Sequence, residues 1–170
     1  MSHRAVIPLG LAVCVMTLLT MAALAATTGR ENPLPPTQVA YLTSCGGCHG
    51  IEGVSAPGEV PTLRGLTGAF LCTPEGRSFL VRLPDVALAT LDDRMLTQVV
   101  NFVVFDLGAP VAGGRQARPY TVAEVARLRR EPLVDTGLTA YRNRVVAGLA
   151  ASCTVPAGLR IYAAKVAMAR

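Results

Sequence analysis

The chain has 170 residues, which suggests one domain, and 51% of them are hydrophobic, which is enough to bury a core. Its formal net charge is +5, but most of the basic residues are scattered, with no aromatic interleaving and no nucleic-acid motif. Composition therefore gives no case for DNA or RNA binding. A solvated helix face is the simpler interpretation of the positive charge, and steering toward an acidic protein partner is the alternative.

Residues 1–26 have the pattern of a secretory signal. His3 and Arg4 form a short basic region, an apolar run follows, and the run ends in the small-residue pattern of Ala23 and Ala25. Cleavage there would export the protein, and the periplasm is the expected location. The run is also long enough for an uncleaved membrane anchor, which stays open. Residues 27–36 are expected to be a polar, proline-bearing spacer.

Helical patterns cover most of the expected folded domain, residues 37–150, and no strand pattern is convincing, so the predicted class is all-α. The expected helices span 38–45, 91–107, 121–131, 138–150 and 159–170, with glycine- and proline-rich loops at 50–68 and 109–119. Segment 70–84 is apolar but irregular and fits either short helix or extended chain. Residues 151–170 are expected to form an additional helical tail.

Capping residues mark where three of these helices begin. Thr37 is expected to cap the first helix. Asp92 and Asp93 lie at the start of the second, where the helix dipole favours negative charge. Thr121 and Glu124 have the spacing of a capping box at the start of the third.

The motif with the clearest chemistry is Cys45-Gly46-Gly47-Cys48-His49. Two cysteines separated by two residues and followed at once by histidine are what covalent attachment of a c-type haem needs. Each thiol adds to one vinyl group of the porphyrin, and the adjacent imidazole can bind the iron. The motif therefore predicts one covalent haem c.

Three competing interpretations of this motif fit less well. A structural zinc site needs four cysteine or histidine ligands, and beyond the signal the chain has one histidine and only two further, isolated cysteines. A thioredoxin-type dithiol needs a βαβ pattern, and none precedes Cys45. A plain disulfide leaves His49 unexplained.

Cys72 and Cys153 remain once the first cysteine pair is assigned to haem. In an oxidising compartment they can pair, closing a loop of about eighty residues that would contribute about 3–5 kcal/mol of stability. Two separate buried thiols are the alternative.

Two stretches of the chain resemble class I bacterial cytochromes c. The first carries the residues Tyr41, Cys45, Cys48, His49, Gly50, Gly53, Pro61, Leu63 and Gly65. The second, Leu91 to Phe102, is similar to the acidic-capped helix of that family. The resemblance implies a small helical bundle around one covalent haem, here with the C-terminal tail added.

Carried over by position, the resemblance implies that Cys45 and Cys48 hold the thioether bonds and that His49 is the iron ligand. It places Pro61 where a loop carbonyl bonds the ligand histidine, which would fix the ring and raise its basicity. A plain turn proline is the alternative for Pro61. Arg77 or Arg82 would pair with a haem propionate, since arginine binds carboxylates bidentately, or would face solvent.

The sixth iron ligand is where the chain departs from the family pattern. Leu83 occupies the expected methionine position and cannot bind iron. Beyond the signal the remaining methionines are Met95 and Met168. Lys165, Cys72 or a partner's side chain are further candidates, and an open position is the last alternative.

The expected function is that of an exported single-haem electron carrier, not an enzyme. Its partners would be redox proteins, such as a periplasmic dehydrogenase that donates and an oxidase or another cytochrome that accepts. One alternative is a haem-c protein with an open iron position that binds a gas or another ligand, or acts as a small haem enzyme. Another is a tightly bound cytochrome subunit of a dehydrogenase complex. Membrane contact is expected only if the signal is uncleaved.

Overall fold

The computed structural model describes residues 33–57, 60–109, 117–134 and 137–160. The chain divides into two compact units, Met1–Leu34 and Pro35–Arg170, and nearly all described residues belong to the second. The predicted signal, most of the predicted spacer, Lys165 and Met168 lie outside the described residues.

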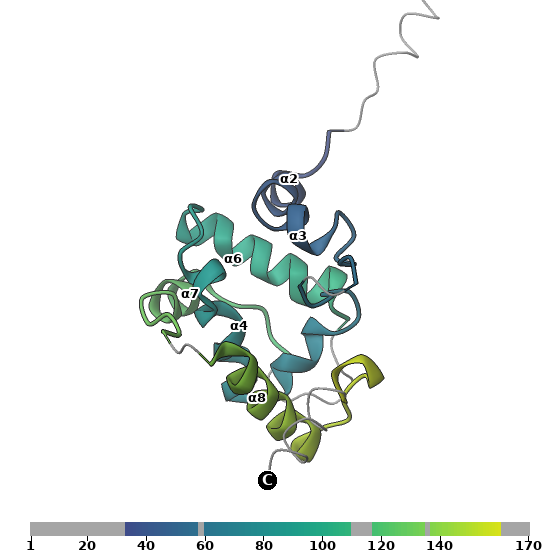
Figure 1. Cartoon of the computed structure of the whole chain (residues 1–170). Coiled ribbons are helices and arrows are strands. Elements are labelled where there is room, and N and C mark those ends of the chain that lie inside the picture. Colours follow the sequence, from purple (N-terminus) through teal and green to yellow (C-terminus); the bar gives the residue numbers. More distant parts are fainter. Residues whose placement is uncertain (1–32, 58–59, 110–116, 135–136, 161–170) are drawn as a thin grey trace, which may run out of the picture. The chain divides into compact units, whose positions relative to one another are not determined.

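The second unit is helical, with no strand among its described residues, and this confirms the all-α prediction (Figure 1). In chain order its elements are α2 (Pro36–Tyr41), η1 (Leu42–Gly46), α3 (Gly47–His49), η2 (Thr67–Cys72), α4 (Pro74–Arg82), α5 (Pro84–Ala87), α6 (Asp93–Asn101), η3 (Phe102–Leu107), α7 (Val122–Leu128) and α8 (Leu138–Ser152). Elements η1 and η3 are π-helical turns that continue α2 and α6, and η2 is a 3-10 helix. Segment 70–84 is thus helical apart from short breaks.

The first helix begins at Pro36, so the prediction that Thr37 caps it is wrong. Pro36 has no N–H to satisfy and its ring presets a helical φ, so it can open the helix without a side-chain cap. The Thr37 hydroxyl instead lies 3.2 Å from Oε1 of Gln98 and donates to it, which ties this helix to α6. The helical path continues through η1 and α3 and stops at Gly50, where φ is +75°.

Helix α2 lies against α6 (Figure 1). A small apolar cluster joins the two helices. Tyr41, Val99 and Leu107 are buried in it, and Met95 packs at its edge. The Asp92 carboxylate accepts a bond of 2.7 Å from the backbone N–H of Met95 and so caps α6. Asp93 lies in the first turn, where the helix dipole was expected to favour negative charge. The packing of α2 on α6 positions the segment that carries the cysteine motif.

Helix α7 is joined to α4 by a buried ion pair. The guanidinium of Arg77 is only 4% exposed and donates to both carboxylate oxygens of Glu124, at 2.6 and 2.8 Å. It also stacks 3.9 Å from the ring centre of Tyr120. Thr121 accepts from the Glu124 N–H, so that half of the predicted capping box is present, but the Glu124 carboxylate faces Arg77 instead of closing the box. The helix ends at Leu128, three residues before the predicted end at 131.

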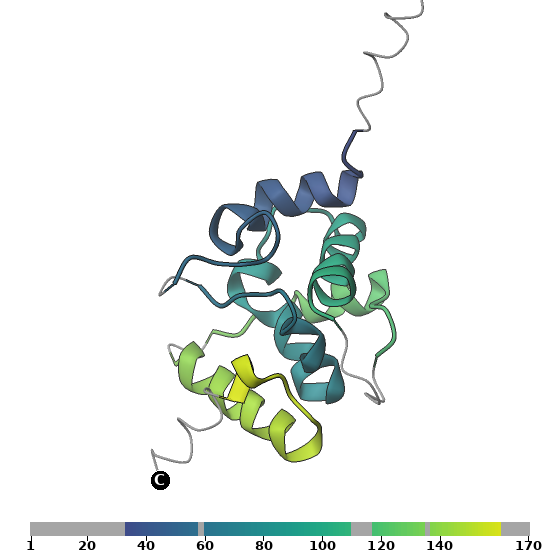
Figure 2. The ribbon, with the colours of Figure 1, turned by 90° about the vertical axis from the view of Figure 1, so that its right-hand side faces the viewer.

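Helix α8 packs on η2 and α4, and a disulfide joins its C-terminal end to η2. Cys72 and Cys153 are the partners, with Cα atoms 6.5 Å apart, within the usual range for a disulfide. The chain then turns back, so that Val155 and Leu159 are buried in the same cluster as Leu149. Figure 2 shows this last described turn, residues 157–160, beside α8. Two residues of the described part of the predicted tail, Val155 and Leu159, are therefore part of the core.

Candidate cofactor site

The cysteine motif lies on the last helical turns before the first loop. Cys45 is half-buried and belongs to η1, Cys48 is exposed and belongs to α3, and neither is in a disulfide. Residues three apart are neighbours on a helix surface, so the two thiols lie close to one another along the helix. Burial raises the pKa of the Cys45 thiol. A dithiol oxidoreductase needs the opposite shift at its attacking cysteine.

Next in the chain, His49 is held by the loop that follows it. Its Nδ1 lies 3.0 Å from the backbone oxygen of Pro61. A carbonyl can only accept, so Nδ1 carries the proton and, in the neutral ring, Nε2 keeps its lone pair for a metal. The contact that the family resemblance implied between these two residues is present. Their role toward a haem stays a prediction.

Two glycines in left-handed conformations fold this loop back onto the helix. Gly50 and Gly53 have φ of +75° and +76°, which side chains rarely adopt. The Gly53 carbonyl accepts from the N–H groups of Leu63 and Arg64, at 2.8 and 2.9 Å. The Tyr41 hydroxyl donates to the Gly50 carbonyl at 2.7 Å, which fastens the loop to α2. These hydrogen bonds fold the loop back on itself, so that Pro61 lies next to His49.

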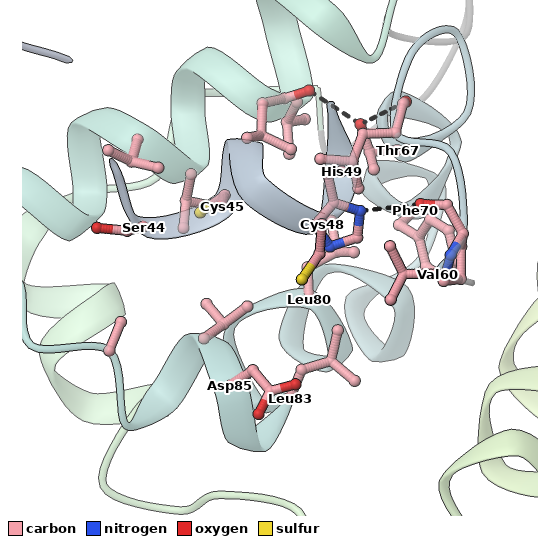
Figure 3. Close-up of a pocket in the computed structure, with 18 of the residues that line it drawn as sticks. Ser44, Cys45, Cys48, His49, Val60, Thr67, Phe70, Leu80, Leu83 and Asp85 are labelled. Atoms are coloured by element: carbon pink, nitrogen blue, oxygen red, sulfur yellow. Dashed lines mark hydrogen bonds between the residues drawn. The ribbon is translucent and has the colours of Figure 1, made fainter. Parts of the chain in front are cut away.

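A cavity of about 620 Å³ opens beside the motif, within the size range of cofactor sites (Figure 3). The motif contributes Cys45, Cys48 and His49 to its lining, and the loop contributes Pro61. The remaining walls come from η2, α4, α5, α6, η3, α8 and the last turn, whereas α2 and α7 contribute none of the lining residues. The apolar side chains among them are Val60, Leu63, Leu66, Phe70, Phe79, Leu80, Leu83, Val86, Leu91, Leu96, Val99, Val100, Val103, Val104, Leu138 and Leu159.

Across the cavity from the motif the wall is made by the end of α4 and by α5. Figure 3 shows Cys48 and His49 entering from one side and Leu83 and Asp85 from the other. Leu83, at the predicted methionine position, therefore does line the site. Met95 does not line it, because it packs between α2 and α6.

The arginines that the sequence proposed for a propionate lie elsewhere. Arg77 is engaged with Glu124, and Arg82 donates to the Glu131 carbonyl at 2.6 Å. Neither lines the cavity, whereas Arg142 of α8 does and is the one cationic lysine or arginine among its described lining residues. Sequence reasoning missed Arg142. The available signal was its helical spacing of four from Leu138, which places both on one face of the predicted helix.

The zinc interpretation finds no support in the described part of the chain. No group of three or more histidine, cysteine, aspartate or glutamate side chains there is arranged to hold a metal ion. The histidine and the two thiols thus border a cavity large enough for a cofactor without forming a closed metal site of their own.

Comparisons of the chain with protein-family models, with curated proteins and with solved structures found no significant match. The resemblance to cytochromes c therefore depends on the residues named above.

Proposed function

We propose that this protein is an exported c-type cytochrome that binds one haem covalently and carries single electrons between redox proteins. The observation that supports it most directly is the bond from His49 Nδ1 to the Pro61 carbonyl at the edge of a large apolar cavity. That bond orients the ring and leaves Nε2 as the basic nitrogen.

The two thiols fit covalent attachment. Cys45 and Cys48 are both free and both line the cavity. In attachment each thiol would add its sulfur to one carbon of a vinyl C=C bond and its hydrogen to the other. The S–H bond and the second bond of the C=C pair would be replaced by a C–S and a C–H bond, so neither an oxidant nor a leaving group would be required.

The cavity walls match the rest of such a cofactor. Leucine, valine and phenylalanine side chains provide a large apolar surface for a flat macrocycle, and their burial excludes water from it. Arg142 lines the cavity and would pair with a carboxylate of the cofactor, since arginine binds carboxylates bidentately. When bound, the iron supplies the one-electron couple, and the surrounding side chains tune its potential.

Electron exchange requires that one edge of the site be near the surface, and the exposure of Cys48 supports that arrangement. The proposed partners are a dehydrogenase that donates and an oxidase or another cytochrome that accepts. Such encounters are brief and bury little area. None of the described helices has the length and hydrophobicity needed to cross a membrane.

The test is production of the full chain in cells equipped for cytochrome maturation. The purified protein should be red, should keep its colour under denaturing conditions, and should show the added mass of one haem. The Cys45→Ser/Cys48→Ser variant should lose that mass. The matched Cys72→Ser/Cys153→Ser variant, which also removes two thiols, should keep it. Colourless protein of unmodified mass would refute the proposal.

A further inference from the structure

We infer that the face of the site opposite His49 is a binding site for a small neutral diatomic gas such as carbon monoxide or nitric oxide. The inference rests on the proposed function, because the iron would have to be bound to His49. It goes beyond that function, because an electron carrier needs no ligand from solution.

The first support is the chemistry of the wall that faces the motif. Leu80 and Leu83 line it from the end of α4 (Figure 3). Val86 lines it from α5. These side chains are hydrocarbons, and none has a lone pair to offer a metal. These three side chains therefore offer no ligand to a metal held by His49.

The second support is that the described candidates for a sixth iron ligand, Met95 and Cys72, lie away from this wall or are already bonded. Met95 packs between α2 and α6, and Cys72 is bonded to Cys153. Among the described residues that line the cavity, sulfur and imidazole groups come from the cysteine motif alone. Asp85 is the acid on this side, and it is exposed to solvent.

The apolar wall also decides which class of small ligand fits. An anion such as cyanide, or an ionised peroxide, would lose its hydration against these three hydrocarbon side chains without a partner among them, which is costly. A neutral diatomic molecule loses almost none. Distal polarity and hydrogen-bond donors are what favour oxygen binding and activation, and the leucines and the valine offer no donor. Carbon monoxide and nitric oxide are therefore the favoured ligands.

The experiment is carbon monoxide titration of the dithionite-reduced holoprotein, followed by absorption spectroscopy, after the covalent haem has been verified by mass. The wild type should bind the gas with a saturable change in the Soret band. Leu83→Met would place a thioether on the facing wall and should weaken gas binding at least tenfold. Leu88→Met, at a side chain 71% exposed on the same segment, is the matched control and should leave binding unchanged.

The outcomes separate the two proposals. Absence of covalent haem would refute the proposed function itself. A haem that is attached but stays low-spin and unmoved by carbon monoxide would overturn only this inference. The Met168→Ala and Lys165→Ala variants complete the test: if either one opens a site that is closed in the wild type, the C-terminal segment supplies the sixth ligand and the inference is wrong.

Discussion

Replacing Arg77 by methionine tests whether the buried ion pair holds the cavity wall in place. Arg77 lies on α4, which also carries Leu80 of the cavity, and it joins that helix to α7 through Glu124. Methionine keeps an unbranched apolar stem but removes the charge and its hydrogen bonds. The Glu124 carboxylate, 14% exposed, would keep only its bond of 3.1 Å to Arg118.

The expected cost follows from these contacts. Removing one partner of a buried pair destabilises a protein by about 3–5 kcal/mol, and we expect the lower end because Glu124 keeps some exposure and a second cation. Loss of the stacking on Tyr120 adds about 0.5–1 kcal/mol. In urea unfolding of the holoprotein followed by circular dichroism, the midpoint should fall by at least about 1 M.

The pH dependence gives an independent check. Hydrogen bonding from Arg77 is the main cause that lowers the pKa of Glu124 below its ordinary value of 4.5. A lowered carboxyl pKa stabilises the fold at pH values above the ordinary one, and this stabilisation is lost as the pH falls through the folded value. The gap between wild type and Arg77→Met should therefore be largest near neutral pH and shrink below pH 4.5.

Arg82→Met is the matched control for this prediction. Arg82 lies on the same helix but donates to a single backbone oxygen, so its loss should cost only about 0.5–1.5 kcal/mol. Equal midpoints for wild type and Arg77→Met, or a gap that is the same at pH 7 and pH 3.5, would refute the reasoning.

Three further predictions concern the scaffold and the site. Replacing Cys72 and Cys153 by serine should lower the free energy of unfolding by about 4 kcal/mol in urea, because the bond spans 81 positions of sequence. Gly50→Ala should cost at least about 1–3 kcal/mol, because φ there is +75°, and mass spectrometry should show less haem attached. Arg142→Gln should lower the reduction potential of the holoprotein in a spectroelectrochemical titration, because the oxidised iron carries one more positive charge than the reduced iron.

Matched measurements decide each of these. Dithiothreitol added to the wild type should reproduce the loss seen in the serine variant, and unchanged stability would contradict the disulfide. At Gly47 an added Cβ would meet no atom within 4 Å, so Gly47→Ala should change the free energy of unfolding much less than Gly50→Ala. Equal losses of stability in the two variants would contradict the argument from the positive φ of Gly50. Arg144→Gln, at an exposed position of α8, should leave the potential unchanged, and a shift as large as that of Arg142→Gln would indicate only a general charge effect.

Local patterns predicted most of the helices but left segment 70–84 open. Negative charge at Asp92 and Asp93 and the 3.6-residue period identified α6, because both signals are contained in a short window of sequence. The contact between His49 and Pro61 was implied by the family resemblance alone, with a plain turn proline as the alternative. The start of the first helix was misjudged, since two prolines favour an N-terminus without any capping side chain.

Long-range packing is what the sequence could not provide. Nothing near Arg77 in the sequence announces that its partner is Glu124, 47 residues away, because the pairing depends on how α4 and α7 meet. The role of Arg142 in the cavity wall likewise depends on the docking of α8. Helical periodicity shows which face of a helix is buried, but it does not show which other element that face packs against.

The disulfide divides the chain into two topologically different parts. The segment from Cys72 to Cys153 is a closed covalent ring that contains α4 to α8, and the helix carrying the two free thiols is an arm outside it. Under the proposed function, closing that ring and attaching a porphyrin to the arm would be separate covalent steps, because they use different cysteines.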